Sequence, residues 1–147
     1  MIKTILTFSL SLFTLAAQAQ MSPVGLWRSI DDESKQPKAE IRISQTAAGT
    51  LSGVVERSLV TTPSTEPNCT LCTDDRKDKP KIGMEIIRGG QQSDGKAVWE
   101  GGKILDPENG KNYSLRLTPV DGGKKLEVRG YIGTPLLGRT QTWIRVQ

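Results

Sequence analysis

The stretch of sequence that decides the fold is the last segment of the chain, GYIGTPLLGRTQTWIRV, residues 130–146. Its second half sets two arginines and a tryptophan among β-branched residues, which is typical of a β-strand. An unpaired apolar strand at the edge of a sheet promotes aggregation, so this strand requires a partner. We expect that partner to be the stretch PVGLWRSI, residues 23–30. A chain whose last strand pairs with its first forms a closed barrel.

The rest of the chain shows the pattern of a small all-β domain. Short runs of alternating apolar and polar residues lie between turn signals, and no segment keeps the apolar period of a long helix. Six of the expected strands are residues 24–30, 38–45, 51–59, 82–88, 96–105 and 139–146, and two more flank a turn at residues 121–122. Eight consecutive antiparallel strands predict an up-and-down barrel, whose interior holds side chains or one small ligand.

The turn at residues 121–122 also predicts a register for the strands on either side. A two-residue turn there pairs Leu117 with Leu126 on one face of the sheet. On the other face it sets Arg116 opposite Glu127, an attractive pair of charges. Because both pairings are favourable, we expect this register.

The N-terminal residues have the pattern of an export signal. Lys3 precedes an apolar run over residues 5–17, and Ala17-Gln18-Ala19 supplies the small residues of a cleavage site. The run is shorter than the about 20 residues that a membrane-spanning helix needs, so a retained anchor is the less favoured alternative. We therefore expect a signal peptide over residues 1–19 and a mature domain over residues 20–147. The protein should be periplasmic or secreted, with no membrane span after processing.

Composition excludes several classes of function. The formal net charge of +4 is too small for a nucleic-acid-binding surface, so no nucleic-acid partner is expected. The chain has no histidine, which excludes Ser/His/Asp and Cys/His triads, histidine-bound zinc and haem held by histidine. The acidic residues at 31–33, 106 and 108 lie in turn contexts and do not indicate a two-carboxylate hydrolase. We expect no enzyme activity and no cofactor.

Cys69 and Cys72 form a Cys-x-x-Cys motif inside the one long irregular segment, residues 61–81. A zinc site would need further ligands, and only carboxylates such as Asp74 and Asp75 are near in sequence. A redox motif of the thioredoxin kind opens a helix in a βαβ unit, which is not expected here. Because an exported chain meets an oxidising compartment, we predict a disulfide between the two cysteines and no metal.

Gly25 and Trp27 form a Gly-x-Trp motif in the first strand, which resembles the signature of the lipocalin superfamily. In that family the tryptophan lies across the closed end of the barrel, and an arginine from near the last strand packs over its indole ring. The resemblance implies the same closure here, with Arg139 or Arg145 as the arginine. Stacking of a guanidinium group on an indole ring contributes about 0.5–2 kcal/mol.

Longer segments resemble a narrower group of proteins. They are KPKIGM (79–84), GGKILDPENGK (101–111), VRGYIG (128–133) and GRTQTW (138–143). In this order, and together with the two shorter motifs, they resemble a family of bacterial exported proteins known only as a domain of unknown function. The resemblance covers nearly the whole mature chain. It implies a lipocalin-like fold and a periplasmic or secreted location, and it implies no established activity and no catalytic residues.

These observations predict a binding module that holds a small apolar or amphipathic molecule and performs no catalysis. The residues expected to line its interior are Ile41, Ile43, Met84, Ile86, Trp99, Leu115, Leu117, Leu126 and Val128. The alternative is an envelope structural or interaction protein whose barrel is filled by its own side chains. An eight-stranded barrel lies between the filled and the hollow case. Because aromatic residues make up only 5% of the chain, bulky side chains to fill the interior are scarce, which favours the hollow barrel.

Overall fold

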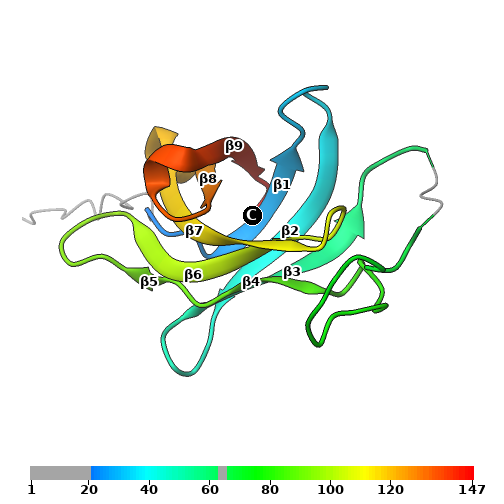
Figure 1. Ribbon diagram of the computed structural model, residues 1–147. Helices are drawn as coiled ribbons and strands as arrows, with labels where there is room; N and C mark the ends of the chain where they lie inside the picture. Colours follow the sequence, from blue (N-terminus) through cyan, green and yellow to red (C-terminus); the bar gives the residue numbers. More distant parts are fainter. Residues whose placement is uncertain (1–20, 63–65) are drawn as a thin grey trace, which may run out of the picture.

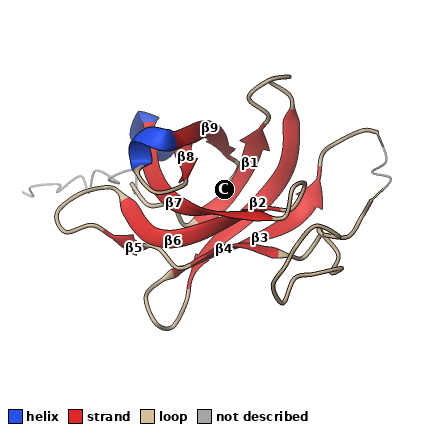
Figure 2. Ribbon diagram, in the orientation of Figure 1, coloured by secondary structure: helices blue, strands red, loops and turns tan. Residues whose placement is uncertain are grey.

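The computed structural model describes residues 21–62 and 66–147, which form a β-barrel (Figure 1). The predicted signal peptide, residues 1–19, lies outside the described residues. Strands and loops make up nearly all of the described chain (Figure 2). The strands are β1 (Gly25–Ile30), β2 (Pro37–Gln45), β3 (Leu51–Ser58), β4 (Glu85–Arg88), β5 (Gln91–Gln92), β6 (Trp99–Asp106), β7 (Lys111–Val120), β8 (Lys125–Tyr131) and β9 (Gly138–Arg145). Two short 3-10 helices are η1 (Asp121–Gly123) and η2 (Pro135–Leu137).

Two pairings complete the closed barrel. Strand β1 pairs with β9, where Trp27 lies opposite Arg145, and β4 pairs with β6, where Ile87 lies opposite Ile104. Each strand runs antiparallel to its neighbours. The predicted eight-stranded antiparallel barrel, with its last strand beside its first, is therefore confirmed. Strand β5 is a two-residue addition that pairs with β6.

The connections between strands gather at two ends of the barrel because neighbouring strands run in opposite directions. One end, the Trp27 end, holds the start of β1, the β2–β3 and β5–β6 hairpins, η1 and the last residues of the chain. The other end, the Arg139 end, holds the β1–β2, β3–β4, β6–β7 and β8–β9 connections.

The register between β7 and β8 differs from the predicted one. Leu117 lies opposite Val128, and Pro119 lies opposite Leu126, which is a shift of two residues. The cause is the connection, since the three residues of η1 have positive φ angles of 52°, 62° and 84° and make a longer turn than the predicted one. A shift of two keeps every side chain on its own face of the sheet, so the inner residues remain inner.

The middle of the barrel is filled by apolar side chains. Ile43, Leu117 and Leu126 are 0% exposed, and Leu115 is 1% exposed. A water-sized space beside these residues would leave part of their surface accessible, so they pack directly against their neighbours. The same core contains Trp27, Ile41, Ile87, Val128 and Trp143.

Strand β4 departs from simple alternation. The sequence predicts Ile86 as an inner residue, whereas Ile86 and Ile87 are both buried. The register between β3 and β4 shifts after Gly53, where β4 has one extra residue. Ile87 lies opposite Gly53, and a Cβ atom on that glycine would stand 2.8 Å from the Cβ atom of Ile87. The bulge therefore turns Ile87 into the space that the glycine leaves.

The segment between β3 and β4 folds against the β6–β7 turn, and Figure 1 shows it in green beside β4. Cys69 and Cys72 form the predicted disulfide, and both are buried. Gly110 of the turn has a φ angle of 73°, and a Cβ atom there would collide with the carbonyl group of Leu71. Only glycine therefore permits the close approach between the turn and the long loop.

Arg76 fixes the long loop to the sheet. It is buried, and its guanidinium donates hydrogen bonds to the Asp74 carboxylate, to the Glu85 carbonyl oxygen at 2.8 Å and to Asn112 Oδ1 at 2.9 Å. The hydrogen bonds from Arg76 hold the pKa of Asp74 far below its usual range. The loop is thus held by the disulfide, by the close approach at Gly110 and by the Arg76 hydrogen bonds.

Replacing both cysteines, Cys69→Ser with Cys72→Ser, is expected to loosen the long loop and leave the barrel folded. The ring closed by the disulfide is short, so the free energy of unfolding should fall by about 2 kcal/mol or less. Urea unfolding measures this loss, and limited proteolysis reports cleavage within the loop. Loss of cooperative unfolding, or a loop as resistant to protease as in the parent protein, would contradict the expectation.

Candidate functional site

The tryptophan of the Gly-x-Trp motif closes the Trp27 end. Trp27 is 0% exposed, and its indole N–H donates a hydrogen bond to the carbonyl oxygen of Pro23 at 2.7 Å. The guanidinium carbon of Arg145 lies 4.1 Å from the centre of the indole ring. The structure thus places Arg145, and not Arg139, over the tryptophan.

Arg145 joins three separate parts of the chain. Its guanidinium donates hydrogen bonds to the carbonyl oxygens of Gly123 at 2.6 Å, Val24 at 2.9 Å and Ser22 at 2.6 Å. Burial lowers the pKa of this guanidinium, but arginine remains charged near neutral pH because its ordinary pKa is so high. The positive charge is therefore stabilised by carbonyl dipoles and by the face of the indole ring.

Gly25 is required for this closure. Its φ angle is 145°, and a Cβ atom there would stand 2.5 Å from Arg145 Nη1 and 2.5 Å from the carbonyl oxygen of Gln147. Both contacts are shorter than packed atoms allow. The glycine of the motif therefore leaves room for the arginine that covers the tryptophan.

Arg139 lies at the opposite end, in a polar cluster. Its guanidinium forms an ion pair with Asp32 in the β1–β2 connection, and its hydrogen bond lowers the pKa of that carboxyl group. Gln141 donates from Nε2 to Asp32 Oδ1 at 3.3 Å and accepts a hydrogen bond from the indole N–H of Trp143 at 3.2 Å. Sequence reasoning missed Asp32 and Gln141. Alternation within GRTQTW puts Arg139, Gln141 and Trp143 on one face of β9, and this pattern is the signal that could have identified Gln141.

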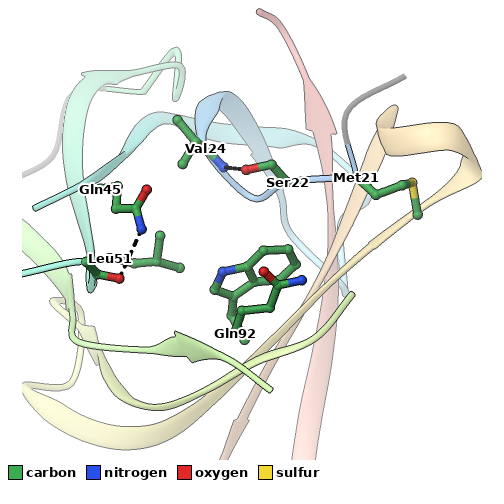
Figure 3. A pocket seen from close by; sticks show the side chains of 8 residues that line it. Met21, Ser22, Val24, Gln45, Leu51 and Gln92 are labelled. Atoms are coloured by element: carbon green, nitrogen blue, oxygen red, sulfur yellow. Dashed lines mark hydrogen bonds between the residues drawn. The ribbon is translucent and has the colours of Figure 1, made fainter. Parts of the chain in front are cut away.

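A pocket lies at the Trp27 end (Figure 3). Its volume is about 340 Å³, which is within the range of small-molecule sites. It is lined by Met21, Ser22, Val24, Gln45, Gly49, Leu51, Gln92 and Trp99. These residues come from the start of the described chain, the β2–β3 hairpin and the β5–β6 hairpin, so one segment and two hairpins at one end of the barrel form the walls.

The pocket carries polar groups with free hydrogen-bonding capacity. The side-chain amides of Gln45 and Gln92 donate to the carbonyl oxygens of Gly49 at 3.1 Å and Lys96 at 2.9 Å, which leaves their amide oxygens as acceptors. Among the described residues, the indole N–H of Trp99 has no hydrogen-bond partner. None of the eight lining residues carries a charge. The pocket can therefore both donate and accept hydrogen bonds without a charged group.

Of the nine residues predicted to line a ligand cavity, Trp99 alone borders this pocket. It lies opposite Leu117 across β6 and β7, at the edge of the packed core, and is partly exposed. The other eight are buried. Sequence reasoning missed Leu51 and the two glutamines of the pocket, because they lie at strand ends where alternation gives no signal.

Two absences hold for the described residues, 21–62 and 66–147. No helix in them is long and apolar enough to cross a membrane. In the same part of the chain, no group of three or more histidine, cysteine, aspartate or glutamate side chains could hold a metal ion.

Comparison with known proteins identifies the family. A family model described as "Uncharacterized protein conserved in bacteria (DUF2147)" matches residues 25–145. The chain belongs to this family. The match begins at Gly25 and ends at Arg145, so it includes both strands that close the barrel. The resemblance of the sequence to a bacterial family of unknown function is confirmed.

The fold is that of a lipocalin. A solved structure described as "Protein HP1028 from the human pathogen Helicobacter pylori belongs to the lipocalin family" is similar to this chain, with a TM-score of 0.70. The similarity covers 84% of this chain and 82% of that chain, at 15% sequence identity. A likeness at this identity shows the fold alone, and the predicted lipocalin-like barrel is confirmed. No protein with a curated description matches the sequence.

Replacing Trp27 with alanine should lower the free energy of unfolding by about 3–5 kcal/mol, because removal of a fully buried indole leaves a cavity. Trp99→Ala is the control, since Trp99 is only partly buried, and it should cost clearly less. Urea unfolding of the two variants beside the parent protein measures both losses. Equal losses would show that closure does not depend on Trp27.

Proposed function

We propose that this protein is a periplasmic or secreted binding module that takes a small, neutral, amphipathic molecule in the pocket bordered by Trp99. The observation that carries the proposal is the partly exposed indole of Trp99 in a pocket of about 340 Å³ with uncharged walls. The lipocalin-like fold supports a binding role rather than catalysis. The apolar run and the Ala17-Gln18-Ala19 site support export.

The chemistry of the walls favours a ligand with one apolar and one polar side. The indole of Trp99 offers a broad apolar face together with a free N–H donor. The amide oxygens of Gln45 and Gln92 accept hydrogen bonds from hydroxyl or amide groups of a ligand. A charged ligand would lose hydration without meeting an opposite charge, which is costly. The site therefore favours a neutral molecule.

The neutral fluorescent probe N-phenylnaphthylamine tests the pocket. Val24→Trp should fill the pocket and reduce probe binding at least tenfold with little change in stability, because Val24 lines the pocket and is 41% exposed. Val146→Trp is the matched control, since Val146 is 40% exposed and lies outside the pocket, and it should bind the probe like the parent protein. Equal binding by all three proteins would overturn the proposal.

Native mass spectrometry of the protein purified from the periplasm identifies the natural ligand. A co-purifying neutral molecule that is absent from Val24→Trp is the expected result. A charged molecule that is retained by Val24→Trp would place binding elsewhere.

A second candidate function is a structural or interaction protein whose barrel is filled by its own side chains. The packed middle of the barrel favours it, since Leu115, Leu117 and Leu126 have almost no exposed surface. In that case the two ends of the barrel, and not its interior, meet other molecules.

Leu117→Trp measures how full the barrel is. Leu117 is 0% exposed, so a larger side chain there should overpack the core and lower the free energy of unfolding by about 1–3 kcal/mol. Binding of N-phenylnaphthylamine at the end pocket should persist in the folded variant. A variant as stable as the parent protein that no longer binds the probe would instead indicate a hollow interior.

A further inference from the structure

The β8–β9 connection exposes an unusual number of aliphatic side chains. Ile132, Leu136 and Leu137 are 65%, 89% and 74% exposed, and we call these three residues the apolar tip. A single exposed aliphatic side chain is ordinary on a protein surface. Three within six residues of one connection form a patch, and such patches mark contacts with another molecule.

The apolar tip is held in this exposed position by hydrogen bonds. The backbone N–H of Leu137 donates to the carbonyl oxygen of Thr134 at 3.0 Å, and that of Thr134 donates to Ile132 at 3.1 Å. Arg129 Nε donates to the carbonyl oxygen of Pro135 at 2.6 Å. The connection is therefore ordered before any partner arrives, which lowers the entropy cost of docking.

Among the described residues, two cations without an ionic partner lie beside the apolar tip. Of the three arginines in residues 128–147, Arg145 lies at the Trp27 end and Arg139 is ion-paired with Asp32 and Glu33, which leaves Arg129. Arg129 also donates to Thr140 Oγ1 at 2.7 Å, and Lys103 donates to Ser114 Oγ at 3.0 Å. Within residues 21–62 and 66–147 neither cation forms an ion pair. Their charges therefore remain available to an anionic surface.

A tyrosine stands beside these cations. Tyr131 lies opposite Ser114, which in turn lies opposite Lys103, so the tyrosine and the lysine share the outer face of the sheet. Arg129 is two residues before Tyr131 and faces the same way. Tyrosine rings favour the boundary between lipid and water, where one end is apolar and the other hydrated.

We propose that the apolar tip docks the protein on the surface of an anionic lipid bilayer. The three aliphatic side chains enter the boundary between head groups and acyl chains, as on other peripheral proteins. Arg129, Lys103 and Tyr131 lie at the level of the head groups. The formal net charge of +4, or +3 without Lys3 of the expected signal peptide, acts in the same direction.

The clustering of its side chains distinguishes the tip from the other exposed aliphatic residues at the Arg139 end. Val60, Leu71 and Ile82 are 52%, 60% and 50% exposed, but each is eleven positions from the next in the sequence. Each is a single exposed aliphatic side chain and not part of a patch. Docking should therefore depend on the β8–β9 connection and not on the long loop.

Sedimentation with vesicles tests the proposal on the full mature chain. The vesicles contain equal parts of phosphatidylglycerol and phosphatidylcholine, or phosphatidylcholine alone. Leu136→Ser with Leu137→Ser should lower affinity for the anionic vesicles at least tenfold, because two apolar side chains no longer enter the bilayer. Lys103→Gln should lower it about fivefold, and only for the anionic vesicles. Leu71→Ser is the matched control and should bind like the parent protein.

Other outcomes would overturn the proposal. They include a parent protein that binds neither kind of vesicle, a tip variant that binds as well as the parent, and a Leu71→Ser variant that loses as much affinity. Analytical ultracentrifugation covers another occupant of the tip, a second copy of the chain. Self-association that disappears in the tip variant, without vesicle binding by the parent protein, would assign the tip to a protein contact instead.

Discussion

The contact between Arg145 and Trp27 is the constraint on which the barrel depends. Strands β1 and β9 share a short register, so backbone pairing alone joins them weakly. The guanidinium group stacks on the indole and donates to three carbonyl oxygens, one in the β7–β8 turn and two in the segment before β1. One side chain therefore joins the first and last strands and closes one end of the barrel. The absence of a side chain at Gly25 makes this arrangement possible.

Closure and dense packing direct function to the ends of the barrel. The packed middle separates the uncharged pocket at the Trp27 end from the apolar tip at the Arg139 end. Strand β9 runs from one end of the barrel to the other, and its alternate residues are Arg139, Gln141, Trp143 and Arg145. A molecule held in the pocket and a surface met by the tip would thus contact the same rigid barrel from opposite sides.

Sequence alone predicts the parts of this fold that depend on alternation and on strong turn signals. The main strands and the pairing of the last with the first follow from such patterns. The Cys69–Cys72 disulfide follows from the expected export, and the two candidate arginines for the closure follow from the resemblance to lipocalins. The register of β7 and β8 does not, because Asp121 adopts a positive φ that no residue pattern demands. The burial of Ile87 does not, because it depends on a bulge opposite Gly53. The end pocket is missed because hairpins far apart in sequence build it.

The pairing of the first and last strands has a consequence for how the protein folds. The backbone N–H of Leu26 donates to the carbonyl oxygen of Gln147 at 3.0 Å, so the closing contact joins opposite extremes of the described chain. Contacts of such sequence separation form late, since a long segment must be ordered before they can form. Until β9 pairs with β1 and β8, the incomplete barrel keeps two unpaired edges. During that interval the open edges can pair with other chains, so the risk of aggregation depends on how fast β9 pairs and on what covers the edges.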